Sequence, residues 1–243
     1  MKVIVTGALG KMGGILSDLV VKAADLELAA KVDCFSKGGE ILKDVSEFMG
    51  EADMVIDFSH HSLTPALLDW CRANKKPLVL CTTGHDEAEK AQVRAAAKEI
   101  PLFFSANMSL GIALLCKMAR ETAKAFPDAD IEIVEAHHNR KLDAPSGTAL
   151  LVAGAIREAR PDMNLVCGRS GMAKRQKNDV GVSALRMGNL AGMHEVIVTT
   201  ETQSLTLKHE VYDRALFAEG AIEAARFLYG KPAGLYDMKD MVK

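Results

Sequence analysis

Lys2-Val3-Ile4-Val5-Thr6-Gly7-Ala8-Leu9-Gly10-Lys11-Met12-Gly13 opens the chain, and this stretch decides the fold. It reads as a short apolar strand, a glycine-rich turn and the start of an amphipathic helix. Glycines at such a turn permit a tight bend, close approach of the backbone to a pyrophosphate, and close packing of helix on strand. The helix N-terminus then offers free N–H groups to a phosphate. The stretch therefore predicts a dinucleotide-binding loop.

Asp33 supports this interpretation, because it stands about 20 residues after Gly13, at the end of the second expected strand. A carboxylate there accepts hydrogen bonds from the ribose hydroxyls and repels a 2′-phosphate, which favours NADH. Lys11 and Lys37 supply positive charge nearby, so NADPH stays open as a cofactor. The alternative is a structural glycine turn in a flavodoxin-like fold that binds another ligand.

The first part of the chain alternates between apolar strands and helical patterns, which is typical of a parallel sheet with helices on both faces. Strands are expected at Val3–Thr6, Leu28–Asp33, Met54–Phe58, Pro77–Cys81 and Leu102–Phe104, and helices at Met12–Ala24, Leu63–Asn74 and Asp86–Glu99.

The pattern changes after Asn107. Helices are expected at Leu110–Ala125 and Thr148–Arg160 around a strand at Ile131–Ala136, and strand-like runs follow at Val182–Met187, Glu195–Thr200 and Ser204–Glu210. Consecutive strands without helices indicate an antiparallel or mixed sheet. The last helix, Ala215–Tyr229, is expected to pack on the first domain. We therefore expect an α/β protein with a Rossmann-type parallel-sheet domain (1–107 and 215–243) and a second α+β domain with a mixed or antiparallel sheet (108–214).

Composition narrows the class of protein. The chain has 243 residues, of which 49% are hydrophobic and 26% charged, with a net charge of −2. This balance gives no basic face for nucleic acid, and no apolar run reaches the length of about 18 residues that spans a membrane. The first residues form a strand rather than a signal peptide, so we expect a cytoplasmic protein. The five cysteines lack the short spacings of metal or redox pairs, and no metal site is expected.

Two more loops follow expected strands, at the edge where parallel sheets bind ligands. They are Cys81-Thr82-Thr83-Gly84 and Ser105-Ala106-Asn107-Met108. Their small side chains suit a nicotinamide pocket lined by backbone, and they equally suit ordinary turns with Thr or Ser caps.

The polar run His137–Thr148 joins the strand Ile131–Ala136 to the next helix. An imidazole exchanges protons near neutral pH, and Lys141 adds a cation four residues after His137. Ser146-Gly147-Thr148 places hydroxyls and N–H groups at a helix N-terminus, which suits a substrate carboxylate. Asp143-Ala144-Pro145 shapes the turn. The alternative for either histidine of the pair is a purely structural role.

The run Glu135-Ala-His-His-Asn-Arg-Lys-Leu-Asp-Ala-Pro-Ser-Gly-Thr148 resembles the signature of the 4-hydroxy-tetrahydrodipicolinate reductase family. The resemblance extends over nearly the whole chain, through the Gly7–Gly13 loop, Ile56–Ser59, Thr82–Gly84, Asn107–Gly111, His194–Val196, Phe217–Ala221 and Gly234–Met238. It implies reduction of that substrate to tetrahydrodipicolinate with loss of water, in the diaminopimelate route to lysine. It further implies use of NADH or NADPH, and a homotetramer formed through the sheet of the second domain.

Residue roles follow from the same resemblance. His137 would be the proton donor and acceptor, Lys141 a second proton donor, and His138, Gly147 and Thr148 would bind substrate. The implied cofactor contacts are Gly7, Ala8, Leu9, Gly10, Lys11, Met12, Asp33, Cys81, Thr82, Thr83, Ser105, Ala106, Asn107 and Met108.

Two alternatives from other classes stay open. One is a dinucleotide sensor without catalysis, which would be expected to lose the proton-transfer residues His137 and Lys141. The other is a two-domain NAD(P)-dependent dehydrogenase that acts on a different carboxylate substrate. This chain also departs from the family pattern at Gly14, His60 and Met193, and the first two changes bear on the preference between NADH and NADPH.

Overall fold

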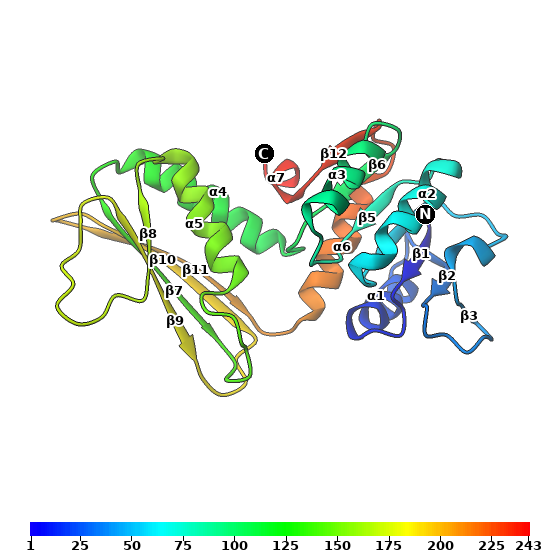
Figure 1. The fold of residues 1–243 in the computed structure, drawn as a ribbon, viewed down its shortest axis with the longest axis horizontal. Helices are drawn as coiled ribbons and strands as arrows, with labels where there is room; N and C mark the ends of the chain where they lie inside the picture. The colour runs from blue at the N-terminus through cyan, green and yellow to red at the C-terminus, as the bar shows by residue number, and fades with distance from the viewer. The chain divides into compact units, whose positions relative to one another are not determined.

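The computed structural model describes Met1–Lys243 and divides the chain into two units, which are described separately (Figure 1). The first unit comprises Met1–Ser109 and Ala215–Met241, and the second comprises Leu110–Arg214. No helix combines the length and the apolar composition needed to cross a membrane.

The first unit is built on a sheet of seven strands in the order β12-β6-β5-β4-β1-β2-β3, and all pairs are parallel. The strands are β1 (Lys2–Thr6), β2 (Glu27–Val32), β3 (Ile41–Leu42), β4 (Met54–Asp57), β5 (Leu78–Leu80), β6 (Pro101–Phe104) and β12 (Gly234–Tyr236). The strand order reverses at β1, whose neighbours are β2 and β4. The expected Rossmann-type parallel sheet is confirmed, and ligands of such sheets bind at this reversal point.

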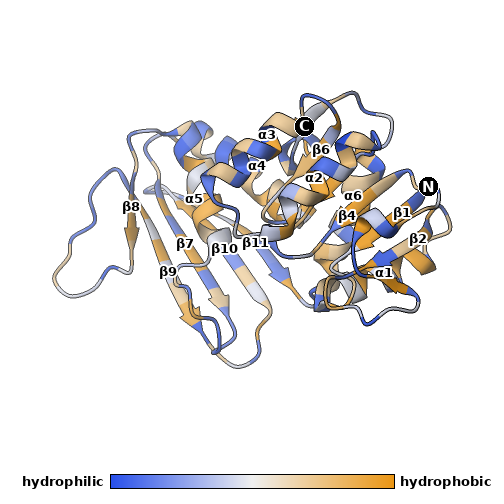
Figure 2. Ribbon diagram, turned by 45° about the vertical axis from the view of Figure 1, so that its right-hand side comes forward, coloured by the Kyte–Doolittle hydropathy of each residue, from blue (hydrophilic) through white to orange (hydrophobic).

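The strands of this sheet are largely apolar because helices cover the sheet (Figure 2). The helical segments are α1 (Lys11–Lys22), η1 (Val45–Glu47), η2 (His61–Leu63), α2 (Thr64–Ala73), α3 (Glu87–Ala96), α6 (Ala215–Leu228) and α7 (Met238–Met241). Helix α6 packs on α1 and on the central strands. Helix α6 also lies directly against the segment after β6, because a Cβ at Gly220 would lie 1.7 Å from the Met108 carbonyl oxygen.

The second unit contains a five-stranded sheet in the order β11-β10-β7-β9-β8. The strands are β7 (Asp130–His137), β8 (Asn164–Cys167), β9 (Asp179–Arg186), β10 (Gly192–Thr199) and β11 (Ser204–Val211). Strand β7 pairs with β10 in antiparallel fashion and with β9 in parallel fashion, so the sheet is mixed. This agrees with the expected second α+β domain.

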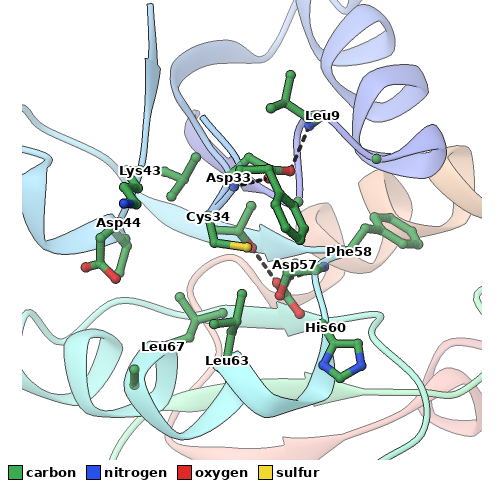
Figure 3. A pocket seen from close by; sticks show the side chains of 18 residues that line it. Leu9, Asp33, Cys34, Lys43, Asp44, Asp57, Phe58, His60, Leu63 and Leu67 are labelled. Atoms are coloured by element: carbon green, nitrogen blue, oxygen red, sulfur yellow. Dashed lines mark hydrogen bonds between the residues drawn. The ribbon is translucent and has the colours of Figure 1, made fainter. Parts of the chain in front are cut away.

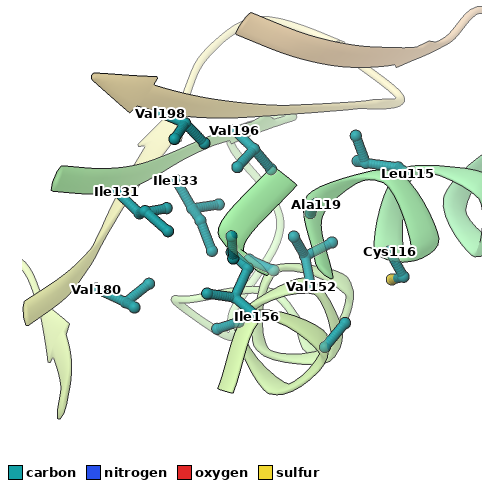
Figure 4. Close-up of a cluster of buried hydrophobic side chains, with 14 of the residues drawn as sticks. Leu115, Cys116, Ala119, Ile131, Ile133, Val152, Ile156, Val180, Val196 and Val198 are labelled. Atoms are coloured by element: carbon teal, nitrogen blue, oxygen red, sulfur yellow. The ribbon is translucent and has the colours of Figure 1, made fainter. Parts of the chain in front are cut away.

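Helices α4 (Leu110–Ala125) and α5 (Gly147–Ala159) pack on one face of this mixed sheet (Figure 4). The core between helices and sheet is formed by alternate residues of the strands, such as Ile131 and Ile133 of β7 and Val196 and Val198 of β10. Alternation of buried and half-buried positions along β10 follows from the two-residue period of a strand.

Several elements differ from the sequence expectation. Strands β3, β8 and β12 and helix α7 were not expected, because each is only two to four residues long. Strand β9 begins at Asp179 rather than Val182, and helix α3 ends at Ala96 rather than Glu99. After Ala96 the chain turns through i→i+3 bonds such as Glu99 N–H to the Ala96 carbonyl. Short edge strands and tightened helix ends have weak periodicity, which explains these errors.

Candidate active site

The glycine loop between β1 and α1 adopts a shape that side chains would prevent. Gly7 has φ +73°, and a Cβ there would lie 2.4 Å from the Phe58 carbonyl oxygen. A Cβ at Gly13 would lie 2.0 Å from the Gly7 carbonyl oxygen. The loop therefore lies directly against the β4 end and the first turn of α1, with the helix N-terminus at its edge. This geometry fits the close approach of a pyrophosphate.

A pocket of about 480 Å³ opens beside this loop and is lined by residues that follow β1, β2 and β4 (Figure 3). Asp33 stands in its wall, buried, at the end of β2. Its Oδ2 accepts the Leu9 N–H at 2.9 Å and its Oδ1 accepts the Phe35 N–H at 2.9 Å. The carboxylate is thereby fixed between the glycine loop and the segment after β2, where ribose hydroxyls would meet it.

Asp57 is a buried carboxylate at the end of β4 that the sequence analysis did not single out. It accepts hydrogen bonds from the hydroxyls of Thr6 and Thr82, both at 2.5 Å, and from the Ser59 N–H at 3.1 Å. These partners lie at the ends of β1, β4 and β5. Asp57 therefore ties together three loops at the ligand-binding edge of the sheet.

The predicted cofactor residues fall into two groups. Gly7, Leu9, Gly10 and Asp33 line the pocket. The others lie outside it, in the same glycine loop and the start of α1 (Ala8, Lys11 and Met12), and in the segments after β5 (Cys81, Thr82 and Thr83) and β6 (Ser105, Ala106, Asn107 and Met108). Among these, Ser105 Oγ donates to the Asn107 carbonyl oxygen at 2.8 Å. Burial raises the pKa of the Cys81 thiol well above its ordinary value, so this side chain contributes an apolar surface.

The second unit carries a polar cluster at the end of β7, centred on the fully buried Glu135. His137 Nδ1 lies 2.6 Å from Glu135 Oε2. Arg186, at the end of the neighbouring strand β9, donates through Nη1 to Oε2 at 2.9 Å and through Nη2 to Oε1 at 2.8 Å. The Ser146 N–H donates to Oε1 at 3.0 Å. One carboxylate therefore joins β7, β9 and the start of α5.

Glu135 is ionised despite its burial. Burial alone would raise the pKa of Glu135, but hydrogen bonds from Arg186, His137 and the Ser146 amide outweigh that effect and lower it below the ordinary value. Arg186 also donates to the Asp143 carbonyl oxygen at 2.6 Å. The same guanidinium thus holds the loop that carries Lys141.

Lys141 lies in this loop, where its Nζ contacts Asp143 Oδ1 at 2.9 Å. The hydrogen bond from Lys141 lowers the pKa of Asp143, and the Gly147 N–H lowers it further. Gly147 is the first residue of α5, and Ser146 caps the helix by accepting the Ala149 N–H at 3.1 Å. A carboxylate is therefore already accommodated by Lys141 and the α5 N-terminus together.

The remaining predicted substrate residues have defined surroundings. His138 Nε2 lies 3.1 Å from Arg214 Nη2, and partial burial together with the nearby Arg140 and Arg214 lowers the pKa of His138. His138 is therefore a neutral ring that accepts from Arg214. Thr148 is the second residue of α5, beside Gly147.

His194 of β10 was not expected in this cluster. Its ring lies edge-on to His137, with centroids 5.1 Å apart, and its Nε2 lies 3.0 Å from Ser146 Oγ. Burial and the neighbouring His137 lower the pKa of His194 to about 4, so the ring is neutral near pH 7. Of the residues that sequence reasoning missed, only Glu135 had a local signal, since it shares a face of β7 with His137 two residues later.

A Rossmann-type sheet with a glycine-rich first loop and a buried carboxylate after β2, together with a second unit that carries a cluster of titratable side chains, is typical of two-domain dinucleotide-dependent oxidoreductases.

Comparisons with known proteins specify the family. Residues 1–108 match the family model for the N-terminus of dihydrodipicolinate reductase, and residues 111–242 match the model for its C-terminus. The chain is 42% identical to the 4-hydroxy-tetrahydrodipicolinate reductase of Caldanaerobacter subterraneus subsp. tengcongensis, over 100% of this chain and 98% of the relative. It is 39% identical to that of Clostridium tetani, over 100% of this chain and 97% of the relative.

A solved structure has a similar fold. It is a dipicolinate-bound dihydrodipicolinate reductase from Paenisporosarcina sp. TG-14, with a TM-score of 0.83, 23% identity and 99% of each chain covered. On the family models and the curated relatives, the chain belongs to the 4-hydroxy-tetrahydrodipicolinate reductase family, also called the dihydrodipicolinate reductases.

Proposed function

We propose that this enzyme reduces 4-hydroxy-tetrahydrodipicolinate to tetrahydrodipicolinate with loss of water, in the diaminopimelate route of lysine biosynthesis. The observation that carries the proposal is the end of β7, where the Glu135 carboxylate joins His137 to the start of α5. Lys141 and the α5 N-terminus already hold a carboxylate there, that of Asp143. The family and the names of the curated relatives support the same reaction.

The first unit binds the dinucleotide in this proposal. The fit rests on the glycine loop, whose close backbone packing a Cβ at Gly7 or Gly13 would prevent, and on the pocket beside it. Bound NADH or NADPH supplies the hydride for the reduction. The loops after β5 and β6, which contain Thr82, Thr83, Asn107 and Met108, are assigned to the nicotinamide half, and Asp57 fixes the loop after β5 through Thr82.

The pocket favours NADH in our proposal. Asp33 presents a carboxylate where a 2′-phosphate would lie, and Asp44 and Asp57 add two further acidic side chains to the lining. The cation in the lining is Lys43, while Lys11 and Lys37 lie outside it. NADPH is accepted less well because Asp33 repels the added phosphate.

The second unit binds the dicarboxylate and moves the protons. Lys141, the Gly147 N–H and Thr148 receive a substrate carboxylate at the α5 N-terminus, in exchange for the contacts that Asp143 makes. His138 contacts the substrate as a neutral ring. The substrate ring loses its 4-hydroxyl group as water and gains a hydride and a proton, and His137 and Lys141 supply the proton. The intact acid–base cluster argues against a sensor without catalysis.

The proposal also covers how copies of the chain assemble and where the protein is located. The buried residues of β10 join the core beneath α4 and α5, so Met193 and Ile197 face the opposite side of the sheet. Val134 of β7 and the exposed Leu185 of β9 lie on that same side by register. We propose that this face, which also carries Glu132 and Glu195 by the same register, joins copies of the chain into a homotetramer, which multi-angle light scattering would test. The cytoplasm is the expected location.

Turnover tests the reaction directly. Oxidation of NADH and of NADPH is followed with freshly generated 4-hydroxy-tetrahydrodipicolinate, and with another carboxylate substrate, such as an α-keto acid plus ammonia, as the comparison. The proposal expects turnover with the first substrate and a higher kcat/KM with NADH. Absence of turnover with that substrate, or turnover with the comparison substrate alone, would refute it.

A further inference from the structure

The four groups that contact the Glu135 carboxylate divide equally between its two oxygens. Oε1 takes Arg186 Nη2 and the Ser146 N–H, and Oε2 takes Arg186 Nη1 and His137 Nδ1. A guanidinium and a backbone amide only donate, and an ionised carboxylate only accepts. The fourth partner, the imidazole, is the only one whose role depends on its tautomer.

From this arrangement we infer that Glu135 is a positioning residue that keeps the proton of His137 on Nδ1, so that Nε2 is the nitrogen that exchanges protons with substrate. Arg186 supports this role because its Nη1 and Nη2 bind the two carboxylate oxygens and so fix the orientation of the carboxylate. The inference rests on the proposed function of His137, but the tautomer itself is a property of the free protein.

The surroundings of Nε2 support the same assignment. Nε2 makes no hydrogen bond within the protein, and Gly192, the first residue of β10, lies close to it. A Cβ at Gly192 would lie 3.1 Å from Nε2. The glycine therefore leaves room next to this nitrogen, on a side chain that is otherwise almost fully buried.

Both directions of proton transfer need Nδ1 protonated. As a base, the ring must offer a bare Nε2, and this requires the neutral tautomer with its proton on Nδ1. As an acid, the ring must carry both protons, and its Nδ1–H then donates to the Glu135 carboxylate. The wrong tautomer, with its single proton on Nε2, is neither a base at Nε2 nor a useful acid.

Glu135→Gln provides a sharp test because an amide has one acceptor and one donor end. Two fixed donors, Arg186 Nη2 and the Ser146 N–H, converge at Oε1, whereas one of the two groups at Oε2 is the adaptable imidazole. The glutamine oxygen will therefore take the Oε1 position, and its NH₂ group will face His137. Nδ1 must then accept, and the proton moves to Nε2.

The measurement is the ¹⁵N spectrum of histidine-labelled protein without substrate, at about pH 8.5 where unperturbed imidazoles are neutral. Loss of a signal in His137→Gln assigns the residue. We expect protonated Nδ1 and bare Nε2 in the wild type, and the reverse in Glu135→Gln. Glu121→Gln is the matched control, since Glu121 lies on α4, away from Glu135, and pairs with Arg120 and Lys124. It should keep the wild-type pattern.

Kinetics supply the second readout. Glu135→Gln should lower kcat by roughly 10³–10⁴-fold, on the scale seen when a buried carboxylate that orients a catalytic histidine becomes an amide. KM should stay within about threefold, because binding of the substrate carboxylate is untouched. Glu121→Gln should keep the wild-type kcat. Circular dichroism confirms that each variant is folded.

Three outcomes would overturn the inference: a wild-type His137 with its proton on Nε2, an unchanged tautomer in Glu135→Gln, or a kcat within about tenfold of the wild type in that variant. The first does not depend on the Glu135→Gln protein, so the test survives if that variant does not fold. Absence of turnover in the wild type would instead refute the proposed function, and the tautomer assignment would be decided by the spectra alone.

Discussion

Acidification should destabilise the fold through His194, whose buried ring joins β10 to the start of α5. Ser146 Oγ accepts the Ala149 N–H and therefore directs its own proton to His194 Nε2. His194 acts as a neutral acceptor, and only 3% of its surface is exposed. Its environment thus disfavours the charged ring.

The magnitude follows from the pKa of His194, about 4 in the folded protein against 6.5 for an ordinary histidine. As pH falls below 6.5, the unfolded chain takes up a proton that the folded protein refuses until about pH 4. Stability is therefore highest above pH 6.5 and decreases across this window. At 1.36 kcal/mol per pKa unit, the loss is about 2 kcal/mol by pH 5 and about 3 kcal/mol in full.

Equilibrium urea unfolding, followed by circular dichroism at pH 7, 6 and 5, measures this loss. His194→Gln is the comparison, because its amide can still accept from Ser146 but does not titrate. The free energy of unfolding should fall between pH 7 and pH 5 by about 2 kcal/mol more in the wild type than in the variant. Equal decreases in the two proteins would refute the assignment of His194 as a buried neutral ring.

Two further predictions concern the first unit. Gly13→Ala should lower the free energy of unfolding by about 3 kcal/mol or more, and with it the melting temperature, because its Cβ would lie 2.0 Å from the Gly7 carbonyl oxygen. It should also weaken dinucleotide binding. Gly14→Ala is the control and should leave the stability unchanged or raise it, because its Cβ would be 3.9 Å from the Ala8 carbonyl oxygen. Equal melting temperatures for the two variants would contradict this prediction. Asp33→Asn should raise the KM for NADH by about 10–100-fold, the scale of a lost charged hydrogen bond, and raise the NADPH-to-NADH ratio of kcat/KM. An unchanged ratio in steady-state assays would show that Asp33 does not select the cofactor.

The sequence was sufficient for much of the fold because its strongest signals are local. The glycine turn after β1, with Asp33 about 20 residues further on, predicts a dinucleotide-binding loop. Short apolar runs alternating with helices predict the parallel sheet. The mixed sheet of the second unit followed from strands without intervening helices. Strand β8 was missed because its four residues are largely exposed and carry no alternating pattern.

The candidate site was only partly predictable for a different reason. His137, Lys141 and Gly147 stand in one short stretch of the chain, from the end of β7 to the start of α5, so their association can be predicted from the sequence. Arg186 is 51 residues from Glu135 in sequence and reaches it only because β9 pairs with β7 in parallel register. His194 reaches the cluster through the antiparallel pairing of β10 with β7. Such contacts depend on strand register, which single-sequence patterns leave open.

The central claim is that His137 moves the proton in the reduction, and His137→Gln tests it most directly. Steady-state kinetics with 4-hydroxy-tetrahydrodipicolinate and NADH would compare this variant with the wild type. We expect kcat to fall by roughly 10²–10⁴-fold with little change in KM, as for loss of a general acid–base group. An unchanged kcat with a raised KM would show that His137 only binds substrate and would contradict the account.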